Sequence, residues 1–166
     1  MNYEGQIIFI HPRTIRPAAP HDIQGILRLV NAHARRGELL PRTALSIRDT
    51  LPDWLVGEQD GRIVACVCLL PYTPLLAEVR SLAVDDSVKG QGWGSAIVQA
   101  LIVEAERRQV PTLFALTRAV HFFEKAGFIV SSKEMFPEKV WRDCTICPIR
   151  HRCDETAVVL NVKRET

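Results

Sequence analysis

The pattern of apolar and polar residues around the middle of the chain predicts a strand, a glycine-rich loop and a helix in succession. Residues 79–84 form a short apolar run with β-branched members, which is typical of a buried strand. Residues 85–87, Asp-Asp-Ser, end that run as turn formers. From Trp93 onward the apolar residues fall on one face of a helix, namely Trp93, Ala96, Ile97, Ala100, Leu101 and Ala105.

The remaining chain predicts a mixed α/β order. Further strands are expected at 14–18, 55–58, 63–70, 112–116, 128–130 and 156–162, and further helices at 23–34, 44–50 and 118–126. Asp22 and Thr43 are placed to cap the first two helices, and Asp60-Gly61 predicts a hairpin turn. Pro71 and Pro74 are expected to bracket the crossing into the central strand.

Size and composition favour one globular domain over residues 1–166. Of its 166 residues, 47% are hydrophobic and 24% charged, which suffices for a core of its own. The net charge of +2 without a basic stripe gives no reason to expect nucleic acid, and no apolar run approaches a membrane span. The N-terminus lacks the features of a secretion signal. We expect a soluble, cytoplasmic protein and leave a homodimer open.

The loop Lys89-Gly90-Gln91-Gly92-Trp93-Gly94 is a candidate phosphate seat. Glycines permit positive φ and close approach of a ligand, and the N–H groups and dipole of the following helix favour an anion. The dinucleotide pattern GxGxxG fails because position 95 is Ser, and the P-loop pattern fails because no Lys precedes Ser or Thr there. Spacing alone also allows a loop that merely caps the helix.

These residues resemble the acetyl-CoA loop of the GNAT acetyltransferases, Q/R-x-x-G-x-G/A after a strand, with Lys89 at the usual Arg or Gln position. VRSLAV before the loop and FFEKAGF after it are also similar to that family. The resemblance implies an α/β (α+β) GNAT fold, with a mixed central sheet of about six to seven strands, helices on both faces, and acetyl-CoA as co-substrate. It implies cofactor contacts from Leu82, Ala83, Val84, Lys89, Gly90, Gln91, Gly92, Trp93, Gly94, Ser95 and Phe123. Backbone N–H groups of residues 82–84 would hold the thioester carbonyl.

Two charged residues stand in the central strand. Period-two counting puts Glu78, Arg80, Leu82 and Val84 on one face. An ion pair at the start of the strand would explain Glu78 and Arg80, and so would an acceptor site. In such a site Glu78 would take the proton that an amine loses before it attacks a thioester, directly or through a water. Arg80 would bind an acceptor carboxylate.

A narrower resemblance concerns the acceptor. The stretches LLPRT (39–43), LAEVRSLAV (76–84), FALT (114–117), FFEKAGF (122–128), PEKVWRDC (137–144) and CDE (153–155) are together similar to stand-alone bacterial N-acetylglutamate synthases. Those enzymes acetylate the α-amine of glutamate, the first step of arginine biosynthesis. The resemblance implies an amino-acid acceptor held by Arg80, Arg42 and Arg118, in that order, with Thr117 nearby.

Other acceptors and another role stay open. They are glutamine or another amino acid, a polyamine, a protein N-terminus, and a non-catalytic CoA-binding sensor. The long synthases carry an amino-acid-kinase domain that binds the inhibitor arginine, and 166 residues leave no room for it. Direct feedback by arginine is therefore not expected.

Two aspects of the chemistry are left unassigned. Many GNAT enzymes protonate the CoA thiolate with a Tyr, but Phe122 and Phe123 occupy that stretch, and Ser81, Thr117, His121 and Tyr72 are the possible substitutes. In the loop at 137–155, Cys144, Cys147 and Cys153 allow reduced structural thiols, a metal site or a disulfide. We assign no metal ligand, because His151 is too close to Cys153 in sequence for a comfortable fourth position. Cys66 and Cys68 alternate in a strand pattern and are expected in the core.

Overall fold

The computed structural model describes residues 13–136 and 153–162 of the chain. The strands are β1 (Thr14–Pro17), β2 (Trp54–Gln59), β3 (Arg62–Thr73), β4 (Leu76–Val84), β5 (Thr112–Thr117), β6 (Ile129–Ser131) and β7 (Thr156–Asn161). The α-helices are α1 (Ile23–Arg35), α2 (Ala44–Asp49), α3 (Trp93–Arg107) and α4 (Val120–Lys125). The order agrees with the prediction. None of these helices is long and apolar enough to cross a membrane.

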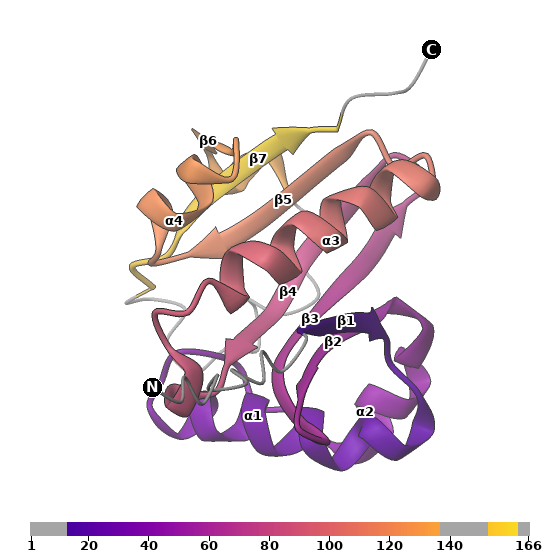
Figure 1. The fold of residues 1–166 in the computed structure, drawn as a ribbon. Coiled ribbons are helices and arrows are strands. Elements are labelled where there is room, and N and C mark those ends of the chain that lie inside the picture. Colours follow the sequence, from indigo (N-terminus) through magenta and orange to yellow (C-terminus); the bar gives the residue numbers. More distant parts are fainter. Residues whose placement is uncertain (1–12, 137–152, 163–166) are drawn as a thin grey trace, which may run out of the picture.

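The strands form one seven-stranded sheet in the order β1-β2-β3-β4-β5-β7-β6 (Figure 1). Neighbouring strands are antiparallel except β4 and β5, which run parallel. Parallel neighbours need a crossover connection, and α3 provides it between these two strands. The predicted mixed sheet is confirmed.

Helices cover both faces of this sheet and create two cores. On one face α3 buries Trp93, Ile97 and Leu101 against β3, β4 and β5, so the predicted inner face of this helix is the buried one. On the other face α1 buries Ile26 and Val30 over β2 and β3. The prediction of helices on both faces is confirmed.

The two predicted helix caps have different outcomes. The side chain of Thr43 accepts a hydrogen bond from the backbone N–H of Ser46 at 3.1 Å and caps α2 as expected. Asp22 precedes α1 but makes no such bond. Its carboxylate instead accepts hydrogen bonds from Arg16, at 2.6 and 3.0 Å, and from the backbone N–H of Ala19 at 2.8 Å. The capping role predicted for Asp22 is therefore wrong, because Arg16 and the preceding turn engage its carboxylate.

The hairpin between β2 and β3 turns at Asp60 and Gly61, whose φ angles of 53° and 75° are left-handed as a tight hairpin requires. The prediction that Pro71 ends the next strand is wrong. β3 continues to Thr73, and Pro71 lies opposite Ala77 of β4. A proline is tolerated there because the register of the two strands shifts just beyond it.

Candidate active site

A β-bulge interrupts β4 at Ser81, whose φ is 54°. Before the bulge Arg80 lies opposite Cys68, and after it Ala83 lies opposite Cys66. The stretch on β4 is therefore one residue longer than the facing stretch of β3, which is the definition of a bulge. The alternation of side chains between the two faces changes phase at this point.

The bulge separates residues that sequence alternation had placed together. Arg80 lines a cavity beside α2, and Glu78 shares its side of the strand. Leu82 and Val84 pack instead against the core beneath α3. The prediction that Glu78, Arg80, Leu82 and Val84 share one face is wrong, because Ser81 breaks the period of two.

Strands β4 and β5 separate soon after they begin. They pair only at Leu76, Ala77 and Glu78 and then diverge (Figure 1). A cavity of about 310 Å³ lies in the gap. Its walls include Leu82 of β4 and Phe123 of α4. Backbone groups of β4 that face this gap can therefore bind a ligand, since β5 no longer pairs with them.

The backbone of Val84 faces the gap. The N–H of Asp85 donates to the carbonyl of Val64 on β3, with 2.7 Å between nitrogen and oxygen. The carbonyl and N–H of a trans peptide point in opposite directions, so the Val84 carbonyl points away from β3. In an extended strand the N–H of a residue lies on the same side as its carbonyl, so the Val84 N–H points away from β3 as well. The Val84 N–H is therefore a candidate for the donor expected among residues 82–84, and that role stays a prediction.

The glycine-rich loop has a backbone geometry that suits an anion-binding site. Gly90 and Gly92 adopt φ angles of 78° and 83°, and Gly92 directly precedes α3. Lys89 and Gln91 are exposed beside them. The first N–H groups of α3, which include those of Gly94 and Ser95, lack partners within the helix. Loop and helix dipole together favour a phosphate here.

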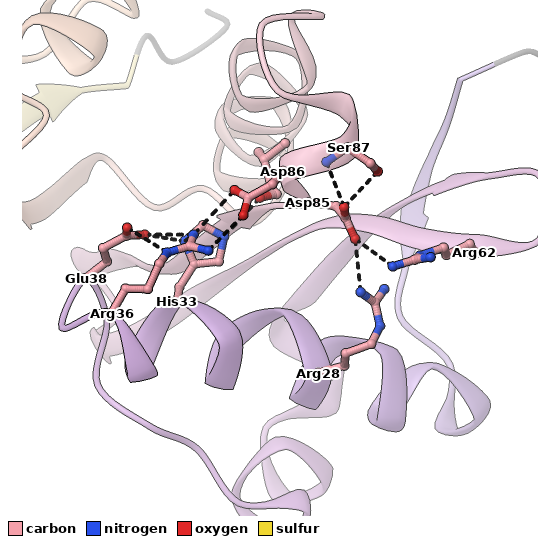
Figure 2. Close-up of polar contacts among 9 residues, drawn as sticks. Arg28, His33, Arg36, Glu38, Arg62, Asp85, Asp86 and Ser87 are labelled. Atoms are coloured by element: carbon pink, nitrogen blue, oxygen red, sulfur yellow. Dashed lines mark hydrogen bonds and ion pairs between the residues drawn. The ribbon is translucent and has the colours of Figure 1, made fainter.

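Asp85 fixes the start of this loop (Figure 2). Its carboxylate accepts hydrogen bonds from the backbone N–H and hydroxyl of Ser87 at 3.0 and 2.7 Å, and from Arg28 and Arg62, each at 3.0 Å. Burial raises the pKa of the Asp85 carboxyl, but the bonds from Ser87 and Arg28 and the charge of Arg62 outweigh it and hold that pKa below its usual range. The loop therefore begins at a rigid, ionised anchor.

Trp93 and Arg13 contact each other beside the loop. The indole of Trp93 is buried in the core, so only the backbone of this residue can face a cofactor. The guanidinium of Arg13 lies 5.3 Å from the Trp93 ring and donates to the carbonyl of Gln91. Sequence reasoning had not marked Arg13, which precedes β1 and is brought to the loop only by the fold.

A second cavity, of about 330 Å³, lies beside α2 on the opposite face of the sheet from α3. Its lining consists of Arg42, Ser46, Asp49, Thr50, Trp54, Cys68, Leu70 and Arg80. Two of the three predicted arginines, Arg42 and Arg80, therefore meet in one place, and Arg42 Nε donates to the hydroxyl of Ser81 at 3.4 Å. Two half-buried guanidinium groups favour a carboxylate ligand. We call this the arginine cavity.

Glu78 lies deeper in the sheet. It is 4% exposed, and its Oε2 accepts a hydrogen bond from the Tyr72 hydroxyl at 2.7 Å. The Tyr72 ring contacts Phe114, with 5.6 Å between ring centroids, and Phe114 stacks on Phe136. Glu78 is not among the described residues that line the two cavities. Its role as a base stays a prediction, and it needs a relay such as a water.

Arg118 and Thr117 are placed apart from the arginine cavity. Both line the gap between β4 and β5. Arg118 Nε donates to Asp154 at 2.6 Å, and this hydrogen bond is the largest of the effects that raise the pKa of its guanidinium. The hydroxyl of Thr117 accepts from the N–H of Ala119 at 2.8 Å. Arg118 thus forms an ion pair with Asp154 and does not line the cavity that contains Arg42 and Arg80.

The cysteines fall into two groups. Cys66 and Cys68 are buried as predicted, and burial raises the pKa of the Cys66 thiol to about 12. Cys144 and Cys147 lie outside the described residues, so the alternatives for the C-terminal cysteines stay open. Cys153 accepts a hydrogen bond from Lys133 Nζ at 3.2 Å. Within residues 13–136 and 153–162 no group of three or more His, Cys, Asp or Glu residues could hold a metal ion.

Comparison with known protein families accounts for the strand, loop and helix together. Residues 26–128 match the model of the acetyltransferase (GNAT) family. The chain belongs to the GNAT family. It is an N-acetyltransferase, and acetyl-CoA is the co-substrate of GNAT enzymes.

Two curated GNAT relatives differ in how much of their length this chain covers. An uncharacterized N-acetyltransferase from Chlorobaculum tepidum is 36% identical over 145 residues, covering 87% of this chain and 94% of the relative. An amino-acid acetyltransferase from Photobacterium profundum is 31% identical over 134 residues, covering 80% of this chain but 30% of the relative. The chain thus spans less than a third of that longer protein.

Solved structures share the GNAT fold. N-acetylglutamate synthase from Neisseria gonorrhoeae, complexed with coenzyme A and N-acetyl-glutamate, superposes with a TM-score of 0.81 over 92% of this chain and 36% of that one, at 24% identity. A Mycobacterium tuberculosis protein in complex with CoA superposes with a TM-score of 0.76 over 90% of this chain and 99% of that one, at 25% identity. The sheet, the gap and the loop described above therefore belong to a fold in which CoA complexes exist.

Proposed function

We propose that this GNAT enzyme transfers the acetyl group of acetyl-CoA to the α-amine of a free amino acid, with glutamate as the leading acceptor. The arginine cavity carries the proposal, because Arg42 and Arg80 offer two guanidinium groups beside the central strand. Glutamate presents two carboxylates, and each can accept a bidentate hydrogen bond from an arginine. The name of the Photobacterium relative, amino-acid acetyltransferase, supports the same class of acceptor. The reaction would form N-acetylglutamate and serve arginine biosynthesis.

The cofactor side of the reaction would use the loop and the gap. Backbone N–H groups of residues 90–95, with Lys89 beside them, would hold the diphosphate of CoA. The N–H of Val84 would donate to the thioester carbonyl and stabilise the negative charge that develops on its oxygen during attack. Phe123 borders the gap and would contact the pantetheine arm. Leu82 and Ala83 complete this stretch of β4.

On the acceptor side, the amine would give up a proton and Glu78 would receive it. The acceptor ammonium first passes a proton to Glu78 through a water, because that carboxylate is buried. The amine nitrogen then attacks the thioester carbon, and the carbon–sulfur bond breaks as the nitrogen releases its second proton to solvent. The CoA sulfur leaves as a thiolate. A thiol with a pKa of about 8.5 can do so near neutral pH without a protein acid, and we assign no such acid.

The test is release of CoA from acetyl-CoA with a panel of free acceptors. The panel contains glutamate, glutamine, aspartate, alanine and spermidine, and mass spectrometry identifies the acetylated product. We expect turnover with glutamate and no turnover with spermidine, because two arginines repel a polycation. Preferred turnover of glutamine or of a neutral amino acid would retain the reaction and change the acceptor. Turnover of spermidine alone would overturn the proposal.

A further inference from the structure

His33, near the end of α1, connects the candidate active site to the loop after the helix (Figure 2). Its Nε2 lies 2.9 Å from the carbonyl oxygen of Val84, and its Nδ1 lies 2.6 Å from Oε2 of Glu38. The side chain is 16% exposed and lines the gap between β4 and β5. Neither the family resemblance nor the predicted site residues had marked this histidine.

The partners of His33 decide where its protons are. A carbonyl oxygen can only accept, so Nε2 must carry a proton and donate to Val84. Glu38 is ionised near neutral pH, because hydrogen bonds from Arg36, together with the bond to His33, lower the pKa of its carboxyl to about 2 against the opposing effect of burial. Nδ1 therefore lies beside an ionised acceptor. Arg36 lies 3.2 Å from Nδ1 and also pairs with Asp86.

The contact between His33 and Val84 matters because the backbone N–H of Val84 can bind a ligand. The carbonyl and the N–H of Val84 both point away from β3, and β5 does not pair with this part of β4. His33 occupies the carbonyl and leaves the N–H directed into the gap. On the far side of the same peptide, the N–H of Asp85 is bound to Val64. The peptide between Val84 and Asp85 is thus held from both sides, which restrains the backbone of Val84 on its C-terminal side, whereas the Val84 N–H belongs to the preceding peptide.

We propose that His33 is a positioning residue for acetyl-CoA, which acts by holding the peptide that follows Val84 and so restraining the Val84 backbone, whose N–H is then ready to bind the cofactor. The inference rests on the use of acetyl-CoA and on the donor role of Val84, and it does not depend on which acceptor is used. Glu38 in turn orients the imidazole ring, as a carboxylate does for many functional histidines.

Three substitutions separate the two contacts of the ring. The amide nitrogen of glutamine reaches about as far as Nε2 of histidine, whereas that of asparagine reaches about as far as Nδ1. His33→Gln therefore keeps a donor for Val84, His33→Asn keeps one for Glu38, and His33→Ala keeps neither. Calorimetric titration with acetyl-CoA, with no acceptor present, measures the Kd for each. His21→Gln, at an exposed histidine before α1, is the matched control.

We expect His33→Ala and His33→Asn to weaken acetyl-CoA binding about tenfold, the effect of losing one hydrogen bond, and His33→Gln and the control to stay within about threefold of the wild type. The KM of the amino-acid acceptor should not change. Equal Kd values for His33→Ala and the wild type would overturn the proposal. So would a His33→Gln variant that binds as weakly as His33→Ala.

A measurement on the unaltered protein covers the case in which a variant does not fold. Long-range ¹H–¹⁵N NMR spectra of the imidazole rings report which nitrogens carry protons. We expect a protonated Nε2 in His33 and a change of its resonances when acetyl-CoA is added. An unprotonated Nε2, or resonances that do not respond to saturating acetyl-CoA, would refute the role. Absence of turnover with every acceptor would instead concern the proposed function, because neither readout requires turnover.

Discussion

Gly57 of β2 lies directly against the indole of Trp93, the first residue of α3. A Cβ built on Gly57 would stand 2.7 Å from Cζ3 of that ring and 3.1 Å from the Cβ of Ala65. No side chain fits in this space while the ring stays where it is. Because Trp93 also begins the helix that follows the glycine-rich loop, this contact sets the position of the loop relative to the sheet.

Gly57→Ala should therefore destabilise the protein by about 2 kcal/mol, the usual cost of overpacking a core. Urea unfolding followed by circular dichroism measures the change. Trp93→Phe provides the space that the new methyl needs, so the double variant should lose less stability than the sum of the single ones. Strict additivity would mean that the methyl is accommodated elsewhere.

Glu78→Gln tests the predicted base. The substitution keeps the shape of the side chain and removes its ability to take a proton, so kcat should fall at least about 100-fold. The Kd of acetyl-CoA should stay unchanged, because Glu78 does not line the gap between β4 and β5. Steady-state kinetics and calorimetry measure the two quantities. If kcat is unaffected between pH 6 and 9, Glu78 has no part in the mechanism.

Tyr72→Phe tests whether the hydroxyl orients that carboxylate. The change removes one hydrogen bond, 2.7 Å long, and leaves the ring against Phe114. We expect kcat to fall about tenfold, with the thermal midpoint little changed. Combining it with Glu78→Gln should add little, since both act on one group. A full additional tenfold loss in the double variant would give Tyr72 a role independent of Glu78.

Substitutions of the predicted arginines should change the acceptor KM by amounts that depend on which cavity each arginine lines. Arg80→Ala is expected to raise the acceptor KM by roughly tenfold to a hundredfold, the effect of losing a charged hydrogen bond, and Arg80→Lys should be intermediate because it keeps charge but loses the planar fork. Arg118→Ala should change the acceptor KM by less than about threefold, since Arg118 pairs with Asp154 and lines the gap between β4 and β5, not the arginine cavity. The reverse order would move the acceptor into the gap between β4 and β5.

Asp22 should make stability depend on pH in the acid range. The hydrogen bonds from Arg16 hold the pKa of this carboxyl below its ordinary value of 3.8, despite the opposing effect of burial. A lowered folded-state pKa stabilises the fold above pH 3.8, and that stabilisation is lost as the pH falls through the folded-state value.

Asp22→Asn should accordingly cost about 2 kcal/mol at pH 7, and its difference from the wild type should shrink as the pH falls below 3.8. Chemical unfolding across pH 2 to 7 measures this. Asp49→Asn, at an exposed position, serves as control. A difference that stays constant down to pH 2 would rule out an ionised Asp22 as its source.

What the sequence could predict depended on local patterns. The apolar run of β4 and the helical spacing after Trp93 each record which residues are buried, so both elements were located correctly. The bulge could not be predicted, because serine at a φ of 54° has no sequence signal and positive φ usually calls for glycine or asparagine. One such residue was enough to place Leu82 and Val84 on the wrong face.

Contacts between residues far apart in the sequence could not be predicted either. His33 and Val84 are 51 residues apart in sequence, and no local pattern joins them. A weaker signal did exist: His33 follows Ile26 by seven residues and Val30 by three, which places it near the buried face of its helix. A polar residue at such a position invites the question of what it binds.

The short pairing of β4 with β5 has a mechanical consequence. Three paired positions join β1–β4 to β5–β7 within the sheet, so backbone hydrogen bonding divides the sheet into two plates that share only these positions. A ligand that inserts its own polar chain between the plates would serve as a missing strand and clamp them. Amide hydrogen exchange in β5 should therefore slow when acetyl-CoA binds, even at residues that the ligand does not touch.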